Sequence, residues 1–514
     1  MKKKTEDISI LNKSKIKYFN NNNNFLIVDR NRLYQSLYLS ILSLAINKKK
    51  KLNPILLHDK TIDEDILKIY KSFGIKKFLK TFENNSIFYN SYLILKAIFY
   101  VFLCLIKTSY KGFEWFVKDF TVEKINIGDL VYDTYIRHGH SYVNPRIEIK
   151  FIKILAIAIL RTLEIKNILI KKNIKFVITQ TNAYSFNSGL SIRAGVYLGK
   201  KVFFQEQNHL TEYTQNKVYN GKFFDRNQRF SKIYKQIKLK RAEFFFKRRM
   251  SGKKETVHLN MFDGIGVKTK DILHSNRHKK KYNKNKLFNF LKCKRKYEKI
   301  ILIGAHAFSD APHSMGKRFI FMDYYSKLKK TLGFIYNNDE KNLWIIKPHP
   351  MEKFYGEVEV NRNLFQKFKK HNIKICPKNI NTKNILELVD YVITARGTIS
   401  IEAACLGVPS MTVGSTPFSG NKIVHECKTK KEYFSILKDL NKMNKMTKKK
   451  IIMAKKKIFY IETFEPYLPS SDIVPLNKVK RSLEKKLFFT TLHRNLRKKP
   501  FTNDRYYKGL LNYL

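Results

Sequence analysis

DYVITARGTISIEAACLGVPSMTVG, residues 390–414, predicts a strand, a tight turn, a helix and a second strand. The β-branched run Tyr391–Thr394 is typical of a buried parallel strand, and residues 398–406 have the length and composition of a helix. Gly407 suits the left-handed position after the last helical turn, and a proline two residues later ends the helix before residues 410–413. This stretch therefore predicts an α/β fold with a parallel sheet.

The turn within this stretch has the residues of a phosphate site. Arg396 supplies a fixed charge, Gly397 allows a tight turn, and Thr398 and Ser400 place hydroxyls at the helix start, with Thr398 as the expected N-cap. Backbone N–H groups at a helix start favour an anion. The alternative is an ordinary βαβ turn in which Gly397 provides only turn geometry.

The length of 514 residues is too great for one core and predicts two domains. Lys and Arg number 102 against 41 Asp and Glu, a net charge of +61. Lysine is enriched along the whole chain together with Asn, Ile, Phe and Tyr, so we interpret the charge as a general bias and expect no specific nucleic-acid partner. A hydrophobic content of 43% predicts folded cores rather than a disordered polybasic chain.

Five scattered cysteines without a CxxC pair indicate neither a disulfide framework nor a zinc site, and favour a reducing cytoplasm. The basic N-terminus has no apolar core or cleavage site, so no signal peptide is expected. The longest apolar run, Tyr92–Ile106, contains Lys96 and is shorter than the roughly 20 residues that cross a bilayer. We predict a core or interfacial helix there.

The order of elements predicts a mobile basic tail over residues 1–24 and a first α/β domain over 25–250, with an apolar helical insertion at 84–120. A second α/β domain is predicted over 251–465. Residues 466–514 form a basic helical extension, expected to pack on the first domain or to touch a membrane surface.

In the first domain, polar side chains gather between residues 125 and 146, where Asp133, Arg137 and His138 are candidates for lining a cleft. The alternative is that each pairs internally.

Glu206 and His209 follow the predicted strand 201–204, and Gln180–Tyr184 follows the strand 176–179. Ligands of open α/β sheets bind at such strand ends, and a carboxylate beside an imidazole suits general acid–base chemistry. An unspecialised polar loop is the alternative.

In the second domain, the predicted strand 299–303 ends in a loop with His306 and Asp310. We expect these groups to line a cavity by hydrogen bonding; a zinc site is a poorer interpretation, because no third ligand is suitably spaced.

The predicted strand 342–346 ends in Lys-Pro-His-Pro, where the prolines stiffen the loop. Lys347 and His349 are therefore candidates for neutralising a diphosphate or a leaving phosphate, and His349 also for donating a proton.

Two motifs together resemble a known family. Residues 402–409, EAACLGVP, resemble the E-A-x-A-x-G-x-P helix of GT-B glycosyltransferases and nucleotide-sugar epimerases. With KPHP at 347–350, the chain resembles the capsule polysaccharide synthesis family, which includes Kdo transferases that use a CMP-linked donor. GDLVYDTYIR at 128–137 and AHAFSDAPHSMGKRFIFMDYY at 305–325 are similar to the same family, and the resemblance covers about residues 125–420.

The resemblance implies a GT-B-like fold, in which two Rossmann-like domains with parallel sheets face a central cleft. The nucleotide-sugar donor would bind the C-terminal domain and the acceptor the N-terminal one. Glu402 would hold the ribose, and Lys347, His349 and the turn 396–398 would meet the phosphates. Thr394 stands where retaining enzymes of the E-x7-E type have an acid.

Breaking a sugar–phosphate bond requires cations near the leaving phosphate and a base near the acceptor. The predicted groups near the leaving phosphate are Lys347, His349 and Arg396. His306 is predicted to bind the donor. The candidates for the base are Asp310, Glu206, His209 and Asp133. No DxD-like metal motif lies in the relevant loops, so we expect a metal-independent reaction with no cofactor beyond a CMP- or UDP-linked sugar.

The sequence therefore favours a cytoplasmic glycosyltransferase of capsular or lipopolysaccharide-type glycan synthesis, acting on a glycan or lipid-linked acceptor with peripheral membrane contact. A nucleotide-sugar epimerase or a polyol-phosphate transferase on the same fold is one alternative. A nonenzymatic protein that binds polyanions or membranes is another.

Overall fold

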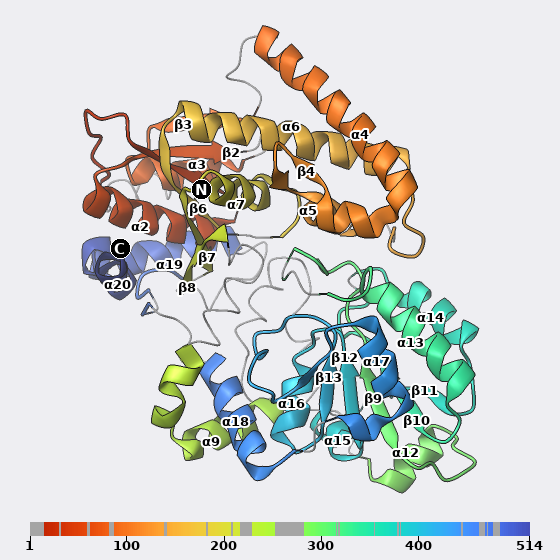
Figure 1. The fold of residues 1–514 in the computed structure, drawn as a ribbon. Coiled ribbons are helices and arrows are strands. Elements are labelled where there is room, and N and C mark those ends of the chain that lie inside the picture. The colour runs from red at the N-terminus through yellow and green to blue at the C-terminus, as the bar shows by residue number, and fades with distance from the viewer. Residues whose placement is uncertain are drawn as a thin grey trace. The chain divides into compact units, whose positions relative to one another are not determined.

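The computed structural model of the chain is shown in Figure 1. It describes residues 15–29, 32–58, 62–81, 87–137, 141–180, 183–206, 209–215, 229–251, 282–314, 316, 319–353, 355–377, 380, 382–443, 446–461, 468–469, 471–475 and 484–514.

The chain forms two compact units. Unit 1 comprises Met1–Tyr135, Arg146–Gly221 and Pro466–Leu514, and unit 2 comprises Ile136–Pro145 and Lys222–Glu465. Each unit is built around one six-stranded sheet, with helices on both sides.

The boundary between the units differs from the one predicted near residue 250. Helix α9 (Leu239–Met250) packs on α18 (Lys448–Phe459), where the rings of Phe245 and Phe459 lie 5.6 Å apart. The residues of α9 therefore belong to unit 2 rather than to the first domain, because the apolar face of this helix is covered by α18.

The sheet of unit 1 has the strand order β3-β2-β1-β6-β7-β8, and all neighbours are parallel except the pair β7 and β8. Its strands are β1 (Asn24–Val28), β2 (Asn53–His58), β3 (Lys77–Lys80), β6 (Ile174–Thr179), β7 (Lys201–Glu206) and β8 (His209–Tyr213). The interior of β1 and β2 is continuously apolar, as expected for parallel strands covered on both faces.

The helices of unit 1 largely follow the predicted periodicity. They are α2 (Leu33–Lys50), α3 (Glu64–Ser72), α4 (Ile87–Asp119), α5 (Gly128–Arg137), α6 (Ile149–Lys171), α7 (Asn187–Tyr197), α19 (Glu484–Lys498), a 3-10 turn (Phe501–Asn503) and α20 (Arg505–Tyr513). A short hairpin of β4 (Thr121–Val122) and β5 (Ile125–Asn126) follows α4. The apolar insertion predicted at 84–120 is therefore α4, which is kinked at Gly112, where φ is 76°.

Residues 15–24 were expected to belong to a mobile tail, and the structure instead ties them to unit 1. Ile16 is buried and its amide donates to the Phe73 carbonyl at 2.9 Å. The side chains of Asn47 and Asn53 accept from the amides of this segment at 3.1 and 2.9 Å and donate to its carbonyls. The two asparagine side chains thus form the hydrogen bonds that a neighbouring strand would otherwise provide to this segment. Composition alone does not reveal these bonds.

The C-terminal extension completes the core of unit 1. Helix α20 lies beside α2 (Figure 1), and Tyr506 meets the ring of Tyr38 edge-on at 4.9 Å. Asp504 caps α20 by accepting from the amides of Tyr506 and Tyr507 at 2.9 and 3.3 Å. The prediction that this segment packs on the first domain is thus met for residues 484–514.

The sheet of unit 2 is parallel throughout and has the order β11-β10-β9-β12-β13-β14. Its strands are β9 (Ile300–Gly304), β10 (Leu343–Lys347), β11 (Ile373–Ile375), β12 (Tyr391–Thr394), β13 (Ser410–Thr412) and β14 (His425–Glu426). In both sheets, counting strands within the unit, the order is 3-2-1-4-5-6, that of the doubly wound Rossmann fold. The predicted α/β fold with two Rossmann-like units is confirmed; that they face a central cleft stays a prediction.

The helices of unit 2 cover its sheet on both faces (Figure 1). Besides α9 and α18 they are α12 (Lys284–Phe290), α13 (Tyr324–Asn338), α14 (Val358–Lys367), α15 (Thr382–Glu387), α16 (Ile399–Cys405) and α17 (Lys430–Lys438), with 3-10 turns at Tyr234–Gln236 and Leu440–Lys442. Helix α13 begins later than a pattern starting at Phe319 predicts, because Asp323 caps it by accepting from the Ser326 amide at 2.6 Å.

Leu510→Ala is expected to lower the free energy of unfolding of unit 1 by about 2–5 kcal/mol, since the side chain is fully buried in its core. Chemical denaturation followed by circular dichroism measures this, with the exposed Leu487→Ala as the matched control. Equal stabilities for the two variants would contradict a core role for the C-terminal helix.

Candidate functional site

The candidate site lies where the strand order of unit 2 reverses, between β9 and β12. In the register, Gly304 at the end of β9 pairs with Thr394 of β12 on one side and with Lys347 of β10 on the other. The loops after these three strands therefore begin side by side. Ligands of doubly wound sheets bind at this point, outside the carboxyl ends of the strands.

Thr394 holds the carboxyl ends of β9 and β12 together. Its buried hydroxyl donates to the Gly304 carbonyl at 2.9 Å. A Cβ on Gly397 would lie 2.8 Å from the same hydroxyl oxygen, so the glycine is required by close approach. The residue that occupies the acidic position of E-x7-E enzymes therefore has a structural role here.

The turn before α16 differs from the predicted phosphate cradle. Thr398 occupies the predicted N-cap position of α16, but its side chain makes no capping hydrogen bond, and the residue is exposed. The buried Ser400 hydroxyl donates to the Gly397 carbonyl at 2.8 Å, and is thereby used inside the turn. The predicted left-handed conformation of Gly407 is confirmed by its φ of 85°.

Arg396 reaches from this turn to the loop after β9. Its Nη2 donates to the Gly316 carbonyl at 2.6 Å, and its guanidinium lies 5.3 Å from the centre of the Phe319 ring. Phe319 in turn meets Tyr324 edge-on at 5.0 Å. The charge of Arg396 is thus held beside the aromatic side chains that follow β9.

The two predicted histidines are brought together by stacking. The His306 ring stacks on Tyr324 at 4.1 Å and on His349 at 5.6 Å. The Met351 amide donates to Nδ1 of His349 at 3.3 Å, which leaves Nε2 as the protonated nitrogen of the neutral ring. Loops after β9 and β10 therefore present imidazoles next to each other.

Both imidazoles are neutral at pH 7. Burial and, to a lesser extent, the neighbouring Arg396 lower the pKa of His306 to about 4. Burial likewise lowers the pKa of His349 to about 3, with His306 acting in the same direction and Asp310 opposing it. His349 was predicted to neutralise phosphate as a cation; in this setting it is a neutral hydrogen-bond donor, because its charge would be desolvated.

Glu357 is a buried carboxylate of this site that the sequence did not reveal. Its Oε1 accepts from the amide and the hydroxyl of Ser309 at 3.2 and 3.3 Å. Its Oε2 is buried and accepts no hydrogen bond within the described part of the chain. Burial raises the pKa of Glu357 to about 7, and Asp310 contributes in the same direction. In the sequence, Glu357 lies directly before α14, where an exposed acidic residue is common, so nothing there indicates a buried site residue.

Asp310 lies in the loop after β9 and is half-buried. Its charge acts on His349, on Glu357 and on Tyr355, whose pKa is raised to about 12 by burial and by Asp310. Arg137 lies in the segment Ile136–Pro145, which is part of unit 2, and its guanidinium lies 4.5 Å from the centre of the Tyr355 ring, so this predicted cleft residue is in the same neighbourhood.

Glu402, the predicted ribose ligand, is engaged by a different group. Arg249 of α9 donates to its Oε1 from Nε at 2.9 Å and Nη2 at 2.8 Å. Both side chains are mostly buried, so this pair holds α9 against α16. A ribose hydroxyl would have to share the carboxylate with this arginine.

The other predicted site residues are Asp133, His138, Glu206 and His209. Asp133 is fully buried within α5. His138 lies outside the described residues. Glu206 and His209 end β7 and begin β8, where they pair across the antiparallel turn; their side chains are outside what the structure describes. The predicted loop after residue 204 is therefore a strand continuation and a hairpin.

Among the described residues, ligand atoms of His425, Cys427 and Glu432 lie within 4.8 Å of one another. Burial raises the pKa of the Cys427 thiol to about 12, so the thiolate that a metal would need is disfavoured. The Nε2 of His425 is 3.0 Å from Glu432 Oε1. This group is better explained as a pair that fastens β14 to α17.

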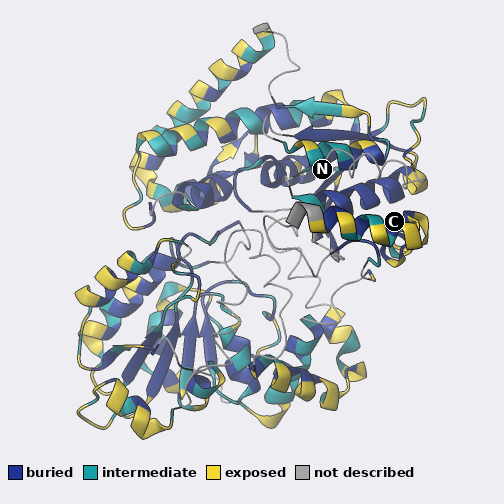
Figure 2. Ribbon diagram, turned by 180° about the vertical axis from the view of Figure 1, so that it is seen from behind, coloured by how far each residue is buried: buried dark blue, intermediate teal, exposed yellow. Residues whose placement is uncertain are grey.

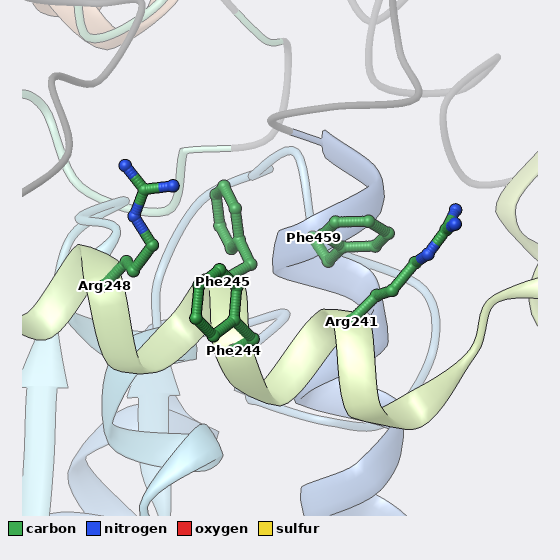
Figure 3. A pocket seen from close by; sticks show the side chains of 5 residues that line it. All are labelled: Arg241, Phe244, Phe245, Arg248 and Phe459. Carbon is green, nitrogen blue, oxygen red and sulfur yellow. The ribbon is translucent and has the colours of Figure 1, made fainter.

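A shallow hollow of about 190 Å³ lies between α9 and α18 (Figure 3). Its lining is Arg241, Phe244, Phe245, Arg248 and Phe459. No carboxylate or imidazole contributes to this lining, so the hollow lacks the groups that bond breaking requires. The candidate site is therefore the strand-end cluster.

Residues 199–434 match the model of the family described as "Capsule polysaccharide biosynthesis protein". The match spans 236 of the 514 residues, so the similarity to this family covers a little under half of the chain. The match runs from β7 into α17 and contains every loop of the candidate site, whereas the similar stretch at 128–137 lies outside it. A search of curated proteins gave no match.

Among solved structures, the chain is similar to two from Thermosulfurimonas dismutans. KpsC, beta Kdo 2,4 transferase, shares 11% identity over 55% of this chain and 79% of that one, with a TM-score of 0.29. KpsC, beta Kdo 2,7 transferase, shares 13% over 65% and 89%, with a TM-score of 0.28. UDP-GlcNAc 2-epimerase from Neisseria meningitidis shares 11% over 86% and 99%, with a TM-score of 0.25.

Glu357→Gln is expected to remove a pH dependence of stability. The folded state raises the pKa of Glu357 from 4.5 to about 7, so its stabilisation is full below pH 4.5 and is lost as the pH rises through 7. The free energy of unfolding of the wild type should therefore fall by up to about 3 kcal/mol relative to the variant over this interval.

Denaturation at a series of pH values measures this difference. The control is Glu359→Gln on the same helix, where the carboxylate is exposed and pairs with Arg362 at 2.6 Å. The free energy of unfolding of Glu359→Gln should change with pH in the same way as that of the wild type. If the free energy of unfolding of Glu357→Gln also followed the wild type at every pH, Glu357 would have an ordinary pKa and the prediction would be wrong.

Proposed function

We propose that the chain is a glycosyltransferase of surface-polysaccharide biosynthesis, which transfers a sugar from a nucleotide-activated donor to a glycan or lipid-linked acceptor. The observation that carries the proposal is the cluster at the switch point of unit 2. There the family-matched segment places Lys347, Arg396, His306 and His349 at neighbouring strand ends, with Asp310 beside them.

In this proposal the leaving phosphate binds next to the fixed charges of Arg396 and Lys347. Charge that develops on a departing phosphate is stabilised best by groups that are already oriented. Arg396 is oriented by the Gly316 carbonyl and by Phe319. His349 adds a neutral Nε2–H donor, which stabilises a phosphate oxygen without competing for a proton from the acceptor.

Asp310 is the first choice for the base that removes the acceptor proton. It is half-buried, its charge acts on His349, and it shares a loop with Ser309, which Glu357 holds. Glu357 itself is fully buried and contacts the loop from behind, which suits a positioning role. Glu206 and His209 stay as candidates from unit 1.

The finer details of the donor also belong to the proposal. We take the donor to be CMP- or UDP-linked, with Kdo as the first sugar to test, and the transfer to be independent of metal. A cytoplasmic location is supported by five free cysteines, four of them buried.

Arg396→Ala and His349→Ala are each expected to lower turnover about 100- to 1000-fold, since each removes a preorganised group near the leaving phosphate. Arg396→Lys should retain part of the activity, because it keeps the charge but loses the planar fork. Donor hydrolysis and transfer assays with CMP-Kdo and with UDP-sugars measure these effects.

The control for these assays is Arg241→Ala, an exposed arginine of α9, which should leave turnover unchanged. Intact turnover in Arg396→Ala and His349→Ala would overturn the assignment of the site. An epimerised donor formed without acceptor would instead identify an epimerase. Salt-sensitive polyanion binding without a saturable nucleotide site would identify a nonenzymatic binder.

A further inference from the structure

Helix α4 exposes a row, or stripe, of apolar side chains on the surface of unit 1. Figure 2 shows the exposed residues along this helix in yellow. The stripe residues follow each other at intervals of three or four, which places them on one face of the helix. They are Phe88, Tyr92, Leu95, Phe99, Phe102, Ile106 and Tyr110, and Ile94 and Ile98 widen the stripe in its middle.

The opposite face of α4 is covered by its own unit. Leu93, Ala97, Cys104 and Thr108 are buried, and α4 packs along α6. The surface side of α4 thus lacks the polar face that a helix of a globular protein normally turns to water. Such a stripe is larger than the scattered apolar residues of ordinary surfaces and indicates an interaction site.

The helix is suited to lie on a membrane rather than to cross one. Residues Phe88–Asp119 have a mean hydropathy of 1.7 over their most apolar window, of which 22% is buried, so length and composition alone would allow a span. However, Lys96 and Lys166 both pair with Glu123 on the covered side, the latter at 2.7 Å. In a spanning helix this ion cluster would enter the hydrocarbon core, which is costly.

The charge of the chain favours an anionic lipid surface over a second copy of the chain. Lys107 and Lys111 are exposed at one end of the stripe, and the chain carries a net charge of +61. Two copies would repel each other, whereas anionic headgroups attract lysines beside an inserted apolar face. The complementarity of charge therefore selects the lipid.

We propose that the exposed stripe of α4 inserts into the outer layer of a membrane that contains anionic phospholipid, with the helix parallel to the surface. The aromatic rings and aliphatic side chains enter the acyl boundary, and Lys107 and Lys111 meet the headgroups. Gly112 ends the inserted segment, because its positive φ breaks the helix there. The inference rests on unit 1 alone and is independent of the proposed transfer.

The test is co-sedimentation of the full chain with vesicles of phosphatidylcholine, with or without phosphatidylglycerol. The variant Phe99→Gln/Phe102→Gln alters two stripe residues that are 58% and 62% exposed, so folding should be retained. Its partition into mixed vesicles should be at least about tenfold weaker, since two phenyl rings no longer leave water.

The matched control is Phe244→Gln/Phe290→Gln, whose side chains are 62% and 53% exposed on helices of unit 2. It should bind vesicles as the wild type does. Lys107→Glu/Lys111→Glu should weaken binding to the mixed vesicles more than binding to phosphatidylcholine alone. Thermal melting of each variant checks that the fold is retained.

Three results would overturn the proposal: an equal loss in the stripe variant and the control, complete release of the wild type by high salt, or no vesicle binding at all. A dimer of the wild type that becomes monomeric in the stripe variant, without vesicle binding, would assign the stripe to a second copy. Turnover on a water-soluble acceptor should be unchanged in the stripe variant, which separates this test from that of the transfer.

Discussion

The parallel pairing of β9 with β12 is the constraint on which the rest of unit 2 depends. It joins Gly304 and Thr394, which lie 90 residues apart, and the Thr394 hydroxyl closes the end of the pair on the Gly304 carbonyl. Because β10 flanks β9 on its other side, three loops start from one edge. The close approach at Gly397 leaves no room for a side chain, so the turn that carries Arg396 is fixed to this edge.

Burial then decides the electrostatics of these loops. It neutralises His306 and His349 and raises the pKa of Glu357, while Arg396 remains charged by its chemistry. The cluster thus separates roles that the sequence left together: a fixed cation, neutral hydrogen-bond donors, and a carboxylate that holds the loop. Site chemistry of this kind depends on which groups lose water on folding.

In unit 1, the roles of helix α4 and of the C-terminal helices likewise depend on what packs against them. The middle of helix α4 is apolar on both sides, and its packing against α6 and neighbouring segments distinguishes its covered face from its exposed one. The C-terminal helices supply Tyr506 and Leu510 to a core that begins with β1 and α2. Both segments have ordinary local patterns, and their roles follow from what lies against them.

The amino-acid sequence by itself determined the alternation of strands and helices, the positions of most strands, the helical insertion and the motifs of the family. Those features depend on local periodicity, on turn residues such as Gly407, and on residues close together in the chain. The tertiary structure alone decided that Thr394 fastens the sheet, that Arg249 engages Glu402, that Glu357 belongs to the site and that His349 is neutral. Each of these depends on burial or on a partner far away in the chain, and no pattern of neighbouring residues specifies either.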